Sequence, residues 1–94
     1  MMENKRYKKI YISGPITKDP DYKKHFEYAE CVLSMAGLIP VNPARNHLEG
    51  NPTWKDFMIV DIKQLVECDG VYMLKGWRKS KGARLERLIA KSLD

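Results

Sequence analysis

The sequence predicts a three-layer α/β domain in which a short parallel sheet of about three strands is flanked by helices. Short β-type runs and longer amphipathic runs alternate along the chain in the order β-α-β-α-β-α, and glycine, proline or asparagine separates most of them. This alternation is typical of parallel strands joined by right-handed crossovers, and we expect the strand order 2-1-3. The 94 residues suffice for one domain, spanning 1–94.

The first half of the chain contains two expected strands and one helix. Residues 8–13 form a strand that is apolar toward both faces, which suits the middle of a parallel sheet, and it ends at the Gly14-Pro15 turn. A helix is expected over residues 21–36, with Gly37 as its C-terminal cap, and a brief strand over 38–41. The inner face of this helix is expected to carry Tyr22, His25, Phe26, Ala29, Leu33 and Ala36.

The second half adds two helices and a third strand. Thr53 is the expected N-cap of a helix that ends near residue 68, and Asp56 completes a variant of the capping box. A strand follows over residues 71–74, and Ser80 caps a last helix that ends near residue 93. A sheet of about three strands has unprotected edges, so we expect a homo-oligomer, as a dimer or higher.

Composition and charge narrow the class of protein. The chain is 44% hydrophobic and 31% charged, with two cysteines that we expect to be reduced thiols inside a cell. Residues 1–9 lack the apolar run of a signal peptide and no stretch reaches membrane-span length, so we expect a cytoplasmic protein without a membrane partner.

The net charge of +5 is unevenly distributed. Only Glu86 opposes the basic residues of the segment 75–91, which are Lys75, Arg78, Lys79, Lys81, Arg84, Arg87 and Lys91. Such a field favours an anionic partner, either a phosphate-bearing small molecule or nucleic acid. The alternative is a solvated helix face that keeps the protein in solution.

Two carboxylates fall where a core is expected. Asp61 lies within the apolar arc of the second helix, and Glu86 lies beside Ile89 and Leu93 on the inner side of the last helix. Asp and Glu are rarely buried without a partner, so the two are a candidate acid/base or nucleophile pair. The alternative is that each is satisfied by a backbone N–H or a lysine. Trp54 is expected in the core of the same arc.

Two turns could hold a ligand. The loop Ser13-Gly14-Pro15-Ile16-Thr17 follows the first strand, at the end where parallel α/β folds bind ligands. Ser80-Lys81-Gly82-Ala83 opens the last helix, whose N–H groups suit an anion, although an ordinary serine cap explains it equally well. His25 and His47 make no metal-ligand spacing with the cysteines, and Trp77 could stack on a base or pack in its loop.

Together these segments resemble the nucleoside 2-deoxyribosyltransferase-like superfamily, and within it a short, poorly characterised branch often encoded by phages and prophages. The matching segments are residues 10–17, 37–43, 54–61, 68–71 and 80–86, so the resemblance covers nearly the whole chain. It implies a flavodoxin- or Rossmann-like domain. It also implies cleavage or transfer of the N-glycosidic bond of 2′-deoxynucleosides or their 5′-monophosphates, with no cofactor and no metal.

The resemblance also implies a role for each matching residue. Glu86 matches the nucleophile that attacks the anomeric carbon, Tyr11 the tyrosine that orients it, and Asp61 an aspartate near the leaving base. The residues expected to bind the substrate are Ser13, Gly14, Pro15, Ile16, Thr17, Asn42, Ser80 and Gly82. Ser80 stands where the transferases usually have aspartate, which is more like the monophosphate hydrolases.

Two other classes of function stay open. One is a nucleotide-binding module of the same fold without turnover. The other is a basic phage accessory protein that binds nucleic acid or a protein partner. Base preference, acceptor, oligomer size and biological role are left undetermined by the sequence.

Overall fold

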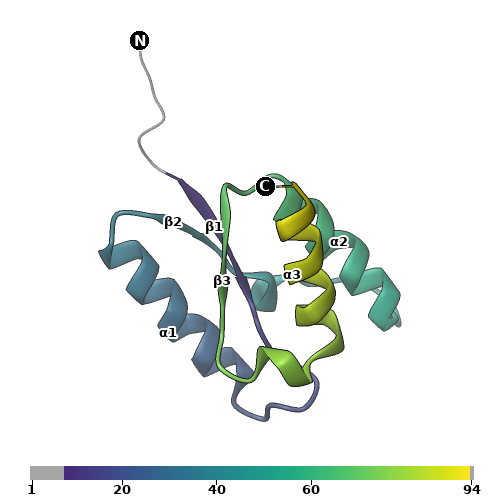
Figure 1. The fold of residues 1–94 in the computed structure, drawn as a ribbon. Helices are drawn as coiled ribbons and strands as arrows, with labels where there is room; N and C mark the ends of the chain where they lie inside the picture. Colours follow the sequence, from purple (N-terminus) through teal and green to yellow (C-terminus); the bar gives the residue numbers. More distant parts are fainter. Residues whose placement is uncertain (1–7, 94) are drawn as a thin grey trace.

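A computed structural model describes residues 8–93. Most of residues 1–9, the basic segment that lacks the apolar run of a signal peptide, therefore lies outside the described residues. The described chain alternates strands and helices as expected (Figure 1). The elements are β1 (Lys9–Ser13), α1 (Tyr22–Met35), β2 (Ile39–Val41), η1 (Pro43–Arg45), α2 (Trp54–Val66), β3 (Gly70–Met73), η2 (Trp77–Lys79) and α3 (Lys81–Leu93), where η marks a short 3₁₀ turn.

The sheet has three parallel strands in the order β2-β1-β3, which confirms the predicted class and strand order. Helix α1 covers one face of the sheet, while α2 and α3 lie side by side over the other (Figure 1). Strand β2 lies on one side of β1 and strand β3 lies on the other. The connections to these two strands therefore run in opposite directions from the carboxyl end of the sheet. Ligands bind at this point in open α/β sheets.

The central strand β1 presents a different chemistry to each helical layer. Side chains alternate across a strand, so Ile10 and Ile12 face α1, where Ile12 joins Phe26, Ala29 and Leu33 in the buried core. Tyr11 and Ser13 face the opposite layer, where both bond to a side chain of α3. Both faces of the strand are buried in the middle of the sheet, as expected, and the face toward α2 and α3 also carries the two hydroxyl groups that bind Glu86.

The helix starts follow the predicted capping. The hydroxyl of Thr53 accepts a hydrogen bond from the backbone N–H of Asp56 at 3.2 Å, and the Asp56 carboxylate accepts one from the N–H of Thr53 at 2.8 Å. Ser80 accepts from the N–H of Ala83 at 3.2 Å at the start of α3. Both helices therefore begin at the predicted residues, which places their first turns at the carboxyl edge of the sheet.

Several boundaries and faces differ from the prediction. Helix α2 ends at Val66 rather than near residue 68, and β3 begins at Gly70, because the N–H of Asp69 already donates to the carbonyl of Lys9 at 2.8 Å. Trp54, expected in the core, is 44% exposed. His25 lies outside the α1 core and pairs with Asp19 at 2.6 Å.

In the last turn of α3, Leu93 is 63% exposed and does not lie on the buried inner face as expected. On α1, Ala36 is likewise exposed, because the helix ends one residue earlier and Ala36 is its C-cap.

Strand β2 is one edge of the sheet and contains a proline. Pro40 lies opposite Ile10 in the parallel register. The preceding residue, Ile39, donates its N–H to the carbonyl of Lys8 at 2.9 Å. Within residues 8–93, no helix is long and apolar enough to cross a membrane.

Candidate active site

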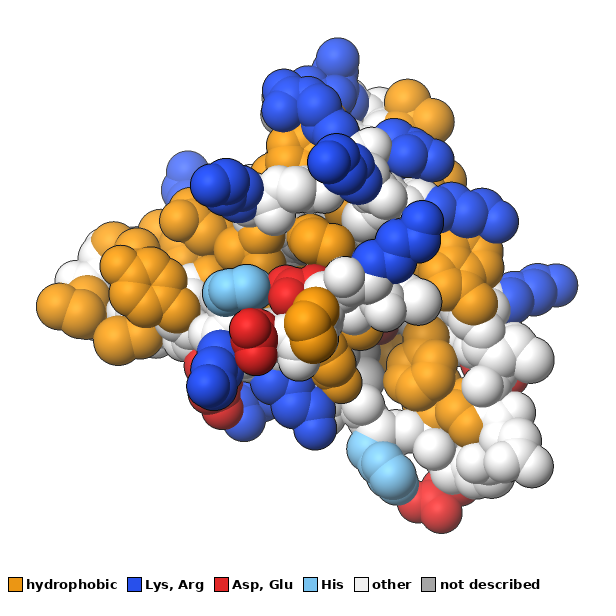
Figure 2. All heavy atoms as spheres, turned by 90° about the horizontal axis from the view of Figure 1, so that it is seen from below, with side chains coloured by type: hydrophobic (Ala, Val, Ile, Leu, Met, Phe, Trp, Pro, Cys, Tyr) orange, Lys and Arg blue, Asp and Glu red, His pale blue; other side chains and the backbone are white. Residues whose placement is uncertain are grey.

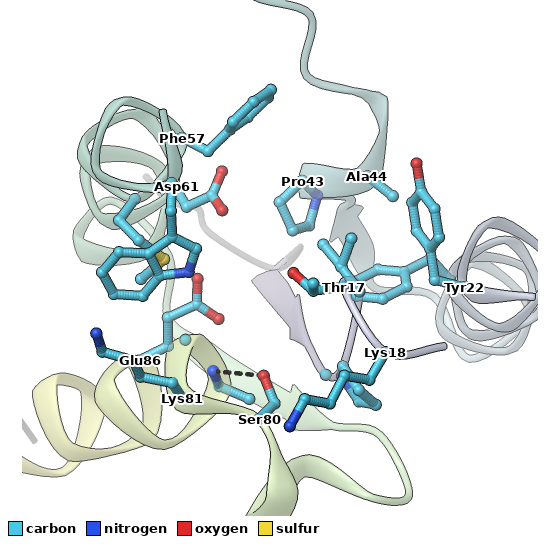
Figure 3. Close-up of a pocket in the computed structure, with 18 of the residues that line it drawn as sticks. Thr17, Lys18, Tyr22, Pro43, Ala44, Phe57, Asp61, Ser80, Lys81 and Glu86 are labelled. Carbon is cyan, nitrogen blue, oxygen red and sulfur yellow. Dashed lines mark hydrogen bonds between the residues drawn. The ribbon is translucent and has the colours of Figure 1, made fainter. Parts of the chain in front are cut away.

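A cavity of about 860 Å³ opens at the carboxyl edge of the sheet, where the crossovers diverge. Its walls come from the loop after β1, from η1 and η2, and from the three helices α1, α2 and α3 (Figure 3). Figure 3 shows Asp61 of α2 and Glu86 of α3 on one side of the hollow, with Thr17, Pro43 and Tyr22 across from them. The two carboxylates predicted from the helical wheels therefore line one cavity.

The Glu86 carboxylate accepts hydrogen bonds from two side chains of the central strand β1. Its side chain is 5% exposed. The hydroxyl of Tyr11 donates to Oε2 at 2.8 Å, and the hydroxyl of Ser13 donates to Oε1 at 2.6 Å. Both carboxylate oxygens are thus fixed by donors on the same face of β1, which is the geometry of an oriented carboxylate.

The surroundings of Glu86 favour its protonated form. Burial raises the pKa of Glu86 to about 7; the Ser13 and Tyr11 hydroxyls oppose this shift, and the charge of Asp61 adds to it. Burial and the adjacent Glu86 raise the pKa of the Tyr11 phenol as well, so Tyr11 acts as a hydrogen-bond donor. A carboxyl group that titrates near neutral pH can either react as an anion or carry a proton.

Asp61 is the second buried carboxylate and is 7% exposed. Its Oδ1 accepts a hydrogen bond from Nδ2 of Asn46 at 2.9 Å. Burial raises the pKa of Asp61 to about 6, and the bond from Asn46 lowers it. Because Asp61 and Glu86 interact, their protons leave in steps that belong to the pair. Between about pH 6 and 7 the pair carries one proton, more often on Glu86 than on Asp61, so the form with an ionised Glu86 and a protonated Asp61 is the minor arrangement of that proton.

The loop after β1, which is expected to bind the substrate, forms part of the cavity wall. Gly14, Pro15, Ile16 and Thr17 all line it. Gly14 lies against Leu74, and a Cβ atom at residue 14 would be 2.7 Å from the Cβ of Leu74. The loop can approach the end of β3 this closely only without a side chain at that position.

Ser13 and Asn42, two of the residues expected to bind the substrate, do not line the cavity. Ser13 is fully buried behind Glu86 and is not part of the cavity wall. Asn42 is also buried and does not line the cavity; its Oδ1 accepts from the N–H of Ala44 at 2.9 Å and so caps η1. These two residues therefore support the site instead of facing a ligand.

Ser80 and Gly82, at the start of α3, do line the cavity. A Cβ atom at residue 82 would meet the sulfur of Met58 at 3.3 Å, so Gly82 allows α2 and α3 to approach closely here. Trp54 lies at the same junction, with Nζ of Lys81 4.4 Å from the centre of its ring. The exposed indole and this lysine form the rim of the cavity.

The rim is basic. The cations that line the cavity are Lys18, Lys79, Lys81 and Arg84. Figure 2, which looks onto this edge of the sheet, shows lysine and arginine side chains gathered over η2 and α3. Trp77 packs within this group, with the guanidinium groups of Arg78 and Arg87 at 4.6 and 5.0 Å from its ring. The mouth of the cavity therefore favours an anionic ligand.

Sequence reasoning missed two polar residues of the site. It places Asn46 only in a loop and does not single out Gln64, although Gln64 is three residues after Asp61 on the same helix face. Within the described residues, no three His, Cys, Asp or Glu side chains gather in a way that could hold a metal ion.

Fold and site together define a small α/β domain with two buried carboxylates in an open cavity at the topological switch point of a parallel sheet. The chain belongs to the family described as a domain of unknown function, DUF4406, whose profile matches residues 8–94. A comparison with curated proteins found no match.

Proposed function

We propose that this domain cleaves or transfers the N-glycosidic bond of 2′-deoxynucleosides or their 5′-monophosphates. The observation that supports the proposal most strongly is the Glu86 carboxylate, which is buried at the cavity and held at both oxygens by Tyr11 and Ser13. A carboxylate that is desolvated and oriented in this way is suited to attack a sugar carbon. Asp61, on the neighbouring helix, is suited to protonate the leaving group.

The proposed reaction has two steps. In the first, an oxygen of Glu86 forms a bond to the anomeric carbon while the bond to the base nitrogen breaks. The electron pair goes to that nitrogen, which takes the proton of Asp61. In the second step, water or another base attacks the same carbon, Asp61 takes back a proton and the Glu86 carboxylate is released. Water as acceptor makes the domain a hydrolase, and a second base makes it a transferase.

The basic rim favours the monophosphates over the free nucleosides. Three cations, Lys18, Lys79 and Arg84, line the cavity on the side where α3 begins after Ser80. A phosphate bound there would contact these cations and the N-terminus of a helix. We expect deoxynucleoside 5′-monophosphates to release base faster than the matching nucleosides.

The test is an assay for free base. The full chain is incubated with each 2′-deoxynucleoside and each 5′-monophosphate, with and without an acceptor base, and the products are separated by chromatography. Glu86→Gln should abolish release, while Glu27→Gln, at an exposed glutamate of α1, should leave it unchanged. If no substrate releases base above the protein-free rate, or if Glu86→Gln releases it normally, the proposal is wrong.

The same variants distinguish the two alternatives. A nucleotide-binding module without turnover binds the monophosphates equally well with glutamine at position 86 and releases no base. A nucleic-acid-binding protein instead binds DNA with an affinity that falls steeply with salt, because each phosphate contact releases counterions.

A further inference from the structure

Behind Asp61, two amide side chains form a reciprocal pair. Nδ2 of Asn46 donates to Oε1 of Gln64 at 2.8 Å, and Nε2 of Gln64 donates to Oδ1 of Asn46 at 3.1 Å. The remaining N–H of Asn46 donates to Oδ1 of Asp61 at 2.9 Å. Asn46 lines the cavity with Asp61, whereas Gln64 does not.

This pairing fixes the position and the plane of the Asn46 amide beside Asp61. An amide can present either its N–H₂ group or its oxygen to a neighbour. An N–H group stabilises the ionised carboxylate, whereas the oxygen would stabilise the protonated acid. Asp61, which accepts when ionised, selects the N–H₂ end of Asn46, and the two bonds to Gln64 hold the plane of that amide so that the N–H₂ group stays directed at Oδ1.

The two oxygens of Asp61 therefore differ. Oδ1 is occupied by Asn46, while Oδ2 accepts no hydrogen bond from residues 8–93. A proton on Asp61 is thus carried on Oδ2. The bond from Asn46 makes the pKa of Asp61 lower than burial alone would make it, so this proton is released more readily. A proton that is held too firmly is a poor proton to give to a leaving base.

We infer that Gln64 is a positioning residue of the site, which acts through Asn46 to keep Asp61 an acid that releases its proton from Oδ2. The catalytic use of that proton rests on the proposed function, but the effect of Gln64 on the ionisation of Asp61 does not. The other titratable groups whose charges interact with Asp61 are Glu86 on α3 and Tyr11 on β1, and substitution at residue 64 leaves both in place.

The test is the titration of the Asp61 carboxyl, followed by carbon NMR in the wild type and in variants. In Asn46→Leu and Gln64→Leu, the midpoint should rise by about one pH unit, roughly a tenfold increase in proton affinity, because the hydrogen bond to the carboxylate is lost in the first variant and weakened in the second. Asn51→Leu is the matched control, since Asn51 is an exposed residue of the same loop.

A second variant keeps the test informative if leucine disturbs folding. Gln64→Glu preserves the shape of the side chain but cannot donate to Oδ1 of Asn46 when ionised, and its charge adds to the effect, so the midpoint should rise here too. The inference is overturned if the Gln64 variants titrate like the wild type, whether or not Asn46→Leu shifts the midpoint.

Activity provides an independent readout. If base release is found, its pH profile should move upward in Gln64→Leu, by less on the alkaline limb than the Asp61 midpoint moves, because both limbs belong to the coupled pair. Because the NMR titration needs no turnover, the proposed function can fail while the role of Gln64 stands. If the protein releases base but the Asp61 midpoint is the same in the Gln64 variants as in the wild type, the proposed function stands and the role of Gln64 is refuted.

Discussion

The buried Glu86 carboxyl should make the stability of the domain depend on pH, and Glu86→Gln should remove the contribution of Glu86 to that dependence. Burial raises the pKa of Glu86 from its ordinary value of 4.5 to about 7. Between these pH values the folded state keeps a proton that the unfolded chain has released. The stabilising effect of this proton is complete below the unfolded value, and it is lost as the pH rises through about 7.

The size of the effect follows from the two pKa values. Each tenfold difference in proton affinity corresponds to about 1.36 kcal/mol, so an increase from 4.5 to about 7 corresponds to about 3 kcal/mol. This is a large share of the roughly 5–15 kcal/mol by which a domain is stable. The neutral amide that Glu86→Gln introduces would avoid this loss, so the variant should gain on the wild type at alkaline pH.

The assay is urea denaturation followed by circular dichroism at a series of pH values from about 3.5 to about 8.5, a range that brackets both pKa values of Glu86. The difference in free energy of unfolding between Glu86→Gln and the wild type should change by about 3 kcal/mol across the series. Glu27→Gln, at an exposed position, should follow the wild type throughout. Parallel curves for Glu86→Gln and the wild type would refute the argument from burial.

Three further predictions concern the same site. Ser13→Ala should raise the pKa of Glu86 further, because the lost hydroxyl donates to the ionised form, and carboxyl NMR measures this shift. Base release should follow a bell-shaped pH profile with its maximum between about 6 and 7, since both carboxyls are protonated below this range, both are ionised above it, and only the singly protonated pair can react; a plateau above pH 8 would contradict the assigned pair. Gly14→Ala should cost about 1–3 kcal/mol in chemical denaturation, because the new methyl group meets Leu74, and adding Leu74→Ala should recover part of that loss.

The parts of the structure that could be predicted are those with a repeating or local signal. Alternating strand and helix patterns were sufficient for the parallel sheet and its order, and the Thr53 cap marked the start of α2. Asp61 and Glu86 stood out because each interrupts an apolar helix face, and a carboxylate in such a position needs partners that hold it.

The parts that escaped prediction depend on contacts between distant segments. Asn46 lies in an irregular loop with no period to place it, 15 residues before the carboxylate it contacts. Trp54 matches the apolar arc of α2, but it stands in the first helical turn, at the cavity rim beside Lys81, where it stays exposed. Asn42 forms a local cap that a sequence pattern does not separate from a ligand contact.

The proline of β2 gives the sheet two unlike edges. Since Ile39 directs its N–H inward to Lys8, the next backbone nitrogen along the strand faces outward, and in Pro40 that nitrogen has no hydrogen to offer. Strand β3 contains no proline and keeps its outward donors. An added strand can therefore extend the sheet at β3 but not continue past β2, so edge-to-edge association of two copies would close as a pair and could not propagate into a fibre.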